Sequence, residues 1–262
     1  INNMKHASII IATVAVAALG LFGFKSPTND YMDMWKKVKE NLEKNLPESA
    51  EKELDAIEKQ ATKDKNQTQL LKTYLYRQNI MQFTVEDDAQ QAFIQYLETK
   101  VGQLDEVHDA LLHEELAKAY ANYLDENDWR ISENLPIEGG DLSKVEMKYW
   151  DRESFKTRIN QHYGEALKPV EALKKAKTED FLVLFDNLTK EATEHVEYGA
   201  SLFEFMLHRV ANYYQGEANA DQAEGDTEKW RLPAQELVKA DLGTRENPPG
   251  KCPEIYQQLT GC

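Results

Sequence analysis

Apolar residues recur every three or four positions over most of residues 30–214, which is the spacing of one face of an α-helix. In the first segment these positions are Tyr31, Trp35, Val38, Leu42 and Leu46. A second stripe, Ala50, Leu54, Ile57 and Ala61, begins directly after a Leu46-Pro47 step. Proline fits the first turn of a helix but restricts the residue before it, so we expect one helix to end at Leu46 and the next to begin at Pro47. This break predicts the tight corner of an αα-hairpin.

Three further helices follow with short connections. The polar residues 63–67 separate the second helix from a third stripe at helical spacing, which consists of Leu70, Leu71, Tyr74, Leu75, Gln78 and Met81. We expect a fourth helix over about residues 87–101 and a fifth over residues 105–124. Short connections between helices favour antiparallel neighbours. The fold class predicted is therefore all-α, with irregular antiparallel helical hairpins and tetratricopeptide-like stacking.

The second half of the pattern is less regular. Residues 125–148 contain Pro136 and the Gly139-Gly140 pair, and we expect a long loop there. Helical spacing resumes over residues 155–167, ends near Pro169, returns after Thr178, and is clear again over residues 203–214. Residues 216–262 begin with a small, polar and acidic stretch, which predicts a flexible tail that closes on a truncated helix. Residues 30–215 are accordingly expected to form the helical domain.

The first 25 residues have a different character. Lys5 and His6 precede a largely apolar run without charged residues over residues 7–24, and we interpret Met4 as the true start. Such a run is typical of an export signal, with Ala15, Ala17 and Ala18 as small residues for a peptidase. It also reaches the lower length limit for a membrane-spanning helix, so residues 1–25 are a signal peptide or an N-terminal anchor. Either reading predicts an exported protein of the periplasm or cell envelope, which would touch the membrane only through this segment.

Charge narrows the range of partners. The chain has 262 residues, and 31 Lys and Arg against 46 Asp and Glu give it a formal net charge of -15. This charge repels nucleic-acid backbones and anionic lipid surfaces, so nucleic acid is not expected as a partner.

No group of residues in the sequence predicts catalysis. Adjacent carboxylates such as Glu114 and Glu115, or Asp87 and Asp88, are expected to face different directions on solvated helix faces. A phosphate-binding glycine loop, a nucleophile motif and a dinucleotide fingerprint do not occur in the sequence. We therefore expect a protein that is not an enzyme and that has no cofactor.

Two kinds of residue, histidines and aromatic residues, remain as candidates for binding sites. Asp105 with His108, and Glu204 with His208, have the spacing at which a helix could present two metal ligands, although the matched ligand set of a di-metal bundle does not occur, and we expect no metal. The aromatic residues Tyr120, Tyr123 and Trp129 could line a groove and form an interaction surface, or could pack in the core. Tyr213, Tyr214, Phe203 and Phe205 present the same alternative.

The two cysteines, Cys252 and Cys262, enclose a short loop near the end of the chain. In an oxidising compartment they could pair, or their proximity could be accidental.

The order of the motifs over residues 30–77 resembles that of a known family. Tyr31, Trp35 and Val38 are followed by the Leu46-Pro47 corner, by the lysines of residues 63–65, and by Leu70, Leu71, Lys72 and Arg77. This order is similar to the start of the mature region in alpha-2-macroglobulin-like proteins of Bacteroidetes-type bacteria. The stretches ELAKAYANYLDENDWRI and SLFEFMLHRVANYY extend the resemblance over about residues 30–215.

The resemblance implies the helical N-terminal region of a longer cell-envelope protein whose β-sandwich domains trap proteases. Its partners would be those downstream domains or another envelope protein. Cys252 is followed by Pro253, so the thioester motif of some family members is not carried over to this chain. We therefore expect a non-enzymatic scaffold or interaction region, and the present sequence to be a fragment. The alternative is a free-standing periplasmic helical-repeat binding module.

Overall fold

The computed structural model describes residues 27–137, 142–184 and 201–222, and within these ranges the regular structure is helical. One antiparallel β-bridge, between Lys177 and Ser201, is the only strand-type pairing in this part of the chain. The predicted all-α class is confirmed. The chain divides into two compact units, Ile1–Ile57 and Glu58–Cys262. The predicted signal, the two cysteines and the end of the predicted tail lie outside the described residues.

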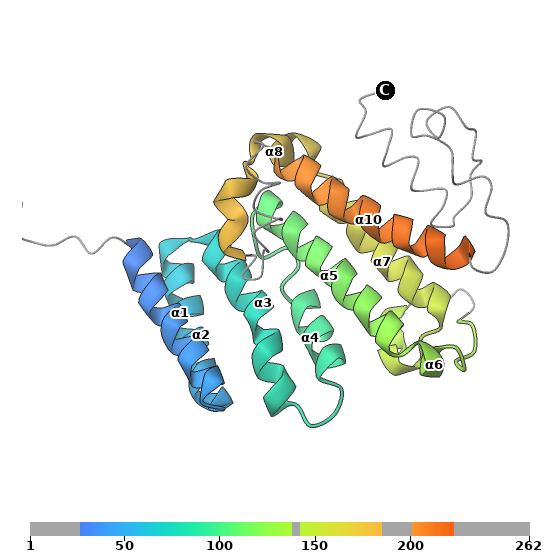
Figure 1. Cartoon of the computed structure of the whole chain (residues 1–262), viewed down its shortest axis with the longest axis horizontal. Helices are drawn as coiled ribbons and strands as arrows, with labels where there is room; N and C mark the ends of the chain where they lie inside the picture. The colour runs from blue at the N-terminus through green and yellow to red at the C-terminus, as the bar shows by residue number, and fades with distance from the viewer. Residues whose placement is uncertain (1–26, 138–141, 185–200, 223–262) are drawn as a thin grey trace, which may run out of the picture. The chain divides into compact units, whose positions relative to one another are not determined.

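The first unit contains α1 (Pro27–Glu43) and the first part of α2 (Pro47–Asp64) (Figure 1). Its buried residues include Tyr31, Trp35 and Val38 from α1 and Ala50, Leu54 and Ile57 from α2, as the apolar stripes predict. Pro47 is the first residue of α2, but α1 ends at Glu43 rather than at Leu46, which is 47% exposed. The reason is Asn45, whose left-handed backbone, with φ 55°, reverses the chain two residues before the proline.

The same helix-ending motif recurs in the second unit, at the end of α2. Lys65 has a φ of 54°, and the N–H groups of Lys65 and Asn66 bond the carbonyls of Thr62 and Ala61. Asn66 then caps α3 (Gln67–Thr84), because its side chain accepts a hydrogen bond from the Gln69 N–H. Leu70, Leu71 and Tyr74 are buried as predicted, whereas Gln78 is exposed.

The next two helices begin at aspartate caps. Asp88 caps α4 (Ala89–Glu98), and Asp105 caps α5 (Glu106–Glu126). The fifth helix is thus close to the predicted range.

The predicted long loop contains more structure than the sequence pattern suggested. Residues 128–149 include α6 (Asp128–Ile131) and the short 3₁₀ turns η1 (Leu142–Lys144) and η2 (Met147–Tyr149). The buried Trp150 fixes this segment, since its indole N–H donates to the Val145 carbonyl at 2.9 Å. The Asn134 amide also donates to the Lys148 and Trp150 carbonyls, at 3.0 and 2.8 Å. In this segment, hydrogen bonds from side chains to backbone carbonyls thus take the place of the regular backbone hydrogen bonds of a helix.

The remaining elements pack against α5, against α3 or against one another. They are α7 (Arg152–Leu167), α8 (Val170–Lys175), η3 (Thr178–Leu184) and α10 (Leu202–Gln222). Helices α5 and α7 form the most extensive contact, α10 packs on α7 and α8, and α3, α4 and α5 pack on one another (Figure 1). Helix α10 continues to Gln222, although a tail was predicted from residue 216.

Helix lengths range from 4 residues in α6 to 21 residues in α5 and α10. The hairpins are therefore irregular, and a tetratricopeptide-like repeat stays a prediction. Among the described helices, none combines the length and apolar character that a membrane span requires.

Candidate functional site

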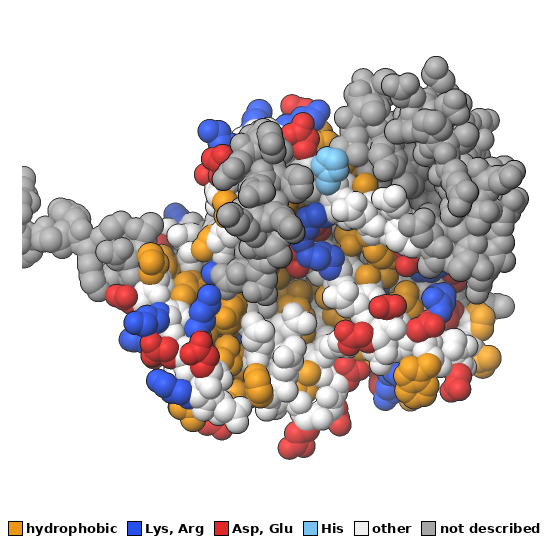
Figure 2. All heavy atoms as spheres, viewed as in Figure 1, with side chains coloured by type: hydrophobic (Ala, Val, Ile, Leu, Met, Phe, Trp, Pro, Cys, Tyr) orange, Lys and Arg blue, Asp and Glu red, His pale blue; other side chains and the backbone are white. Residues whose placement is uncertain are grey.

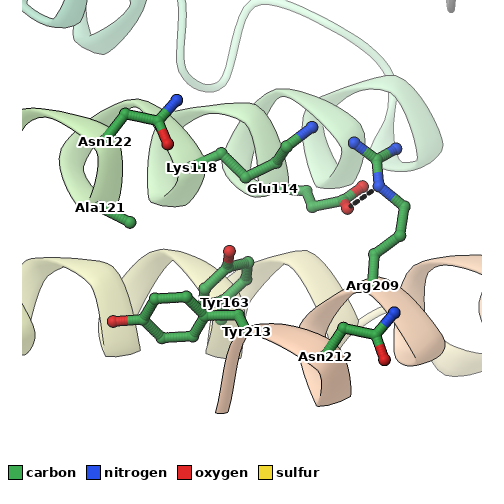
Figure 3. A pocket seen from close by; sticks show the side chains of 8 residues that line it. All are labelled: Glu114, Lys118, Ala121, Asn122, Tyr163, Arg209, Asn212 and Tyr213. Atoms are coloured by element: carbon green, nitrogen blue, oxygen red, sulfur yellow. Dashed lines mark ion pairs between the residues drawn. The ribbon is translucent and has the colours of Figure 1, made fainter. Parts of the chain in front are cut away.

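A cavity of about 320 Å³ lies where α5, α7 and α10 meet (Figure 3). This volume is at the lower end of the range found for small-ligand sites. The residues that line it are Glu114, Lys118, Ala121 and Asn122 from α5, Tyr163 from α7, and Arg209, Asn212 and Tyr213 from α10.

Helical spacing explains how this set comes together. The four α5 residues occupy positions separated by four, three and one, which form one face of a helix, and the three α10 residues are separated by three and one. Neighbouring positions on α5, such as Leu112, Leu116 and Tyr123, are buried against other helices. One long helix therefore supplies both core residues and the wall of the cavity.

The charged residues of the cavity differ in depth. The side chain of Glu114 is fully buried, Arg209 is 22% exposed and Lys118 is 38% exposed. Figure 2 shows Lys or Arg side chains (blue) beside Asp or Glu side chains (red) on the face that carries α5 and α10. Glu114 is thus the deepest of the three charged side chains, with almost no exposed surface on either carboxylate oxygen, and Lys118 is the shallowest.

Arg209 connects the two adjacent glutamates of α5. Its Nε lies 2.8 Å from Oε1 of Glu114, and its Nη2 donates to Oε1 of Glu115 at 2.9 Å. Lys118 also donates to Oε1 of Glu115, at 2.8 Å. Both cations, Lys118 and Arg209, therefore donate directed hydrogen bonds to the Glu115 carboxylate. Neither oxygen of Glu114 receives a directed hydrogen bond from any described residue, although Arg209 is its ion-pair partner.

This arrangement shifts the pKa values of the two glutamates in opposite directions. Burial raises the pKa of Glu114 to about 7, and the attraction of Arg209 only partly opposes this effect. Burial also acts to raise the pKa of Glu115, but Lys118 and Arg209 outweigh it and hold that pKa below its ordinary value. The rings of Tyr163 and Tyr213, with centroids 5.0 Å apart, lie between α5 on one side and α7 and α10 on the other (Figure 3).

A second polar cluster surrounds Glu98 at the end of α4. One oxygen of Glu98 accepts hydrogen bonds from the Tyr120 hydroxyl at 2.7 Å, from Arg158 at 2.7 Å and from Nε2 of His162 at 3.1 Å. Nδ1 of His162 lies 2.8 Å from Nδ1 of His113. A proton shared between these two ring nitrogens thus links the His162 ring, and through it Glu98, to His113. Burial acts to raise the pKa of Glu98, but these donors lower it to about 2.

The structure separates the three aromatic residues predicted as a possible interaction surface. Tyr120 is 3% exposed and Tyr123 is fully buried, whereas Trp129 is 70% exposed. Tyr120 stacks on Trp150 and His162, and Tyr123 stacks on Phe155. The prediction that these three residues line one groove is therefore wrong, because helical spacing directs the two tyrosines into the contact between α5 and α7. The core alternative holds for both of them.

The predicted metal-ligand pairs have other surroundings. Oδ1 of Asp105 accepts hydrogen bonds from the backbone N–H groups of Val107 and His108 and lies 2.7 Å from Nδ1 of His108, so it acts as a helix cap. His208 is exposed, and Glu204 binds the Ser201 N–H at 2.9 Å. Within the described ranges, no three His, Cys, Asp or Glu side chains are grouped as metal ligands.

Sequence reasoning missed Glu114, Arg209, Glu98 and His162. Glu114 was expected on a solvated face, and this is wrong because it lies on the side of α5 that packs against α7 and α10. The signal was present, since Glu114 is four residues after Ala110 and three before Ala117, and both alanines are buried. Asp88 was likewise expected on a solvated face, yet it caps α4 and accepts a hydrogen bond from the Tyr123 hydroxyl.

Compared with models of known protein families, with curated proteins and with solved structures, the chain gives no match.

Proposed function

We propose that this chain is a non-enzymatic helical interaction module, and that the cavity between α5, α7 and α10 is its binding site. The observation that carries the proposal is a fully buried carboxylate, that of Glu114, among the residues that line a cavity between three helices. A buried carboxylate without directed donors costs free energy, and a ligand that supplies donors recovers part of this cost.

The walls of the cavity support a binding role. Asn122 and Asn212 are amides that both donate and accept hydrogen bonds, and Tyr163 and Tyr213 combine an aromatic face with a hydroxyl group. Seven of the eight lining residues carry a polar group, which is more than a typical small-ligand site has, so this cavity favours a polar or charged ligand. The helices also hold these groups more rigidly than loops would.

A second candidate role follows from residues 30–77. The resemblance to alpha-2-macroglobulin-like proteins supports the proposal that the chain is the exported leader region of a longer protease-trapping protein. Tyr31, Trp35, Val38, Leu70 and Leu71, which carry this resemblance, are all buried. In this role these buried residues would form the core of a helical scaffold. The cavity would contact the downstream domains or another envelope protein. Sequencing of the gene beyond its 3′ end tests this role, because the role requires an open frame that continues into β-rich domains.

The binding role is tested by nuclear magnetic resonance of the full chain with four classes of small probe: a primary amine, a carboxylate, a neutral amide and a neutral polyol. We expect one class to shift the resonances of α5, α7 and α10 in a saturable way. The variant Ala121→Leu narrows the cavity and should weaken this binding. Gly164→Leu is the matched control, because open space surrounds the position of its Cβ on α7 and Gly164 does not line the cavity. If none of the four classes shifts these resonances at millimolar concentration, the proposal fails.

A further inference from the structure

The two glutamates at the cavity have unequal partners. Glu115 accepts directed hydrogen bonds from Lys118 and Arg209, at 2.8 and 2.9 Å. Glu114, which is fully buried, has an ion pair with Arg209 Nε, but neither of its oxygens accepts a directed hydrogen bond within the described structure. The acceptor capacity of Glu114 is thus unused. Glu114 lines the cavity, but its oxygens have almost no exposed surface, so a ligand reaches them only when a flexible neighbour such as the Arg209 side chain moves aside.

We propose that the cavity binds a primary ammonium group carried on an aliphatic stem, with Glu114 as its carboxylate partner. This proposal rests on the proposed function and names its ligand class. An ammonium group has three donors and one positive charge, so it satisfies a carboxylate better than a neutral donor does.

The aromatic wall suits the same ligand. The rings of Tyr163 and Tyr213 lie side by side, with an angle of 43° between their planes, and Ala121 adds a methyl group. Ring faces attract an ammonium group and also pack against methylene groups. Asn122 and Asn212 add amides to the lining, and these can bond the polar atoms at the other end of the stem.

Charge favours a cation over an anion. Within the cavity, Lys118 and Arg209 are already engaged with Glu115, so an anion would compete for cations that are paired. The whole chain has a formal net charge of -15, which attracts cations over longer distances.

Two sources of this chemistry are possible: a lysine side chain of a partner protein and a free small amine. The probes are Nα-acetyl-lysine-N-methylamide for the first source and n-butylamine for the second. Tighter binding of the lysine derivative identifies a peptide ligand, because only that probe offers amide groups to Asn122 and Asn212. Tighter binding of n-butylamine identifies a small amine. Both results support the proposal.

The decisive comparison uses calorimetry or resonance shifts of the full chain. Acetylation of the probe's ε-amino group removes its charge and should weaken binding about tenfold or more. The variant Glu114→Gln should have a similar effect, whereas Glu165→Gln on α7, which removes a carboxylate paired with Lys168 outside the cavity, should not. If Glu114→Gln does not fold, Ala121→Leu and the acetylated probe still test the proposal.

The pH profile gives a readout that a structural role of Glu114 would not produce. The charged or titratable groups facing Glu114 are Glu115 and Lys118 from α5, Tyr163 from α7 and Arg209 from α10. Because an ammonium group pairs with ionised Glu114, binding of the amine should strengthen between pH 5 and about 8, and this dependence should be lost in Glu114→Gln. Binding that is insensitive to pH and to acetylation overturns the proposal. A carboxylate or polyol probe that binds in place of the amine overturns it too but leaves the proposed function intact, whereas the absence of binding by every class refutes both.

Discussion

Glu98 and Glu114 are carboxylates in two polar clusters of the same unit, and their pKa values shift in opposite directions. The pKa of Glu98 is lowered to about 2, and the pKa of Glu114 is raised to about 7. Burial is the largest single influence on both and acts in the same direction, upward. The difference must therefore come from the groups around each carboxylate.

Directed donors are the main difference. Glu98 accepts hydrogen bonds from a hydroxyl, a guanidinium and an imidazole, whereas Glu114 has an arginine nearby but no directed donor in the described structure. Glu98 is also 26% exposed, so water stabilises its charge further, while Glu114 has no exposure. The comparison shows that a nearby cation alone does not offset burial when the hydrogen-bond geometry is poor.

The two clusters are consequently suited to different tasks. The cluster of Glu98 is closed, because its donors come from α5 and α7 and hold α4 against both helices. The cluster of Glu114 adjoins a cavity and has acceptor capacity that protein groups leave unused. We interpret the first as structural and the second as available for binding.

The largest expected effect comes from the aromatic residues beside the Glu98 cluster. Phe155 is fully buried and contacts the rings of Tyr120, Tyr123 and Trp150. Phe155→Ala should lower the free energy of unfolding by about 3–5 kcal/mol, because it removes buried apolar surface and leaves a cavity. Denaturant unfolding measures this loss. Trp129→Ala, at a residue that is 70% exposed, is the control and should change stability by about 0.5 kcal/mol or less.

The next effect tests the structural role of Glu98 directly. Glu98→Gln should cost about 2–3 kcal/mol at pH 7, because Arg158 and His162 lose their charged acceptor. Tyr120→Phe removes one of the three donors and should cost only about 1 kcal/mol. Because the pKa of Glu98 is lowered, its contribution is complete above its ordinary pKa and is lost as the pH falls towards about 2. Equal losses at pH 7 and pH 2 would contradict this assignment.

How far the sequence could predict this structure depends on the kind of interaction. Apolar spacing located the helices well, because Trp35, Leu54 and Phe155 have few favourable places other than the core. The end of α1 was placed three residues too late, because the left-handed backbone of Asn45 depends on local hydrogen bonds that the apolar pattern does not report.

The candidate site was harder to predict because its residues come from separate helices. Glu114 and Arg209 are 95 positions apart in sequence, and nothing in the local pattern of either helix predicts that they meet. A polar residue between buried positions, as Glu114 is between Ala110 and Ala117, was the available signal, but it does not identify the partner. The packing of α10 near α5 supplies that information.

A smaller effect is expected at Asp105, a carboxylate that is half exposed yet has several donors. Asp105→Ala should lower the free energy of unfolding by about 1 kcal/mol, because the cap of α5 is lost. Asp105→Asn should keep most of the stability that the cap contributes, because asparagine also caps helices well. Thermal unfolding of both variants measures the difference. If Asn is as harmful as Ala, the contact with the His108 ring outweighs the backbone bonds in importance.

The smallest change at neutral pH is expected for Glu114→Gln. A carboxylate whose pKa is about 7 gains little from its ion pair at that pH, and Arg209 retains Glu115 as a partner, so stability should change by about 1 kcal/mol or less. The pH dependence of the free energy of unfolding is more informative than the size of its change at neutral pH. Between the ordinary glutamate pKa and about pH 7, the folded protein binds a proton at Glu114 that the unfolded chain has released, so Glu114 makes stability fall as the pH rises. The free energy of unfolding, measured from pH 5 to 8, should show this decline in the native protein. In Glu114→Gln the part of the decline that Glu114 contributes should be absent. If both proteins have the same slope, Glu114 is ionised throughout this range, and the contrast with Glu98 would be much smaller than the structure indicates.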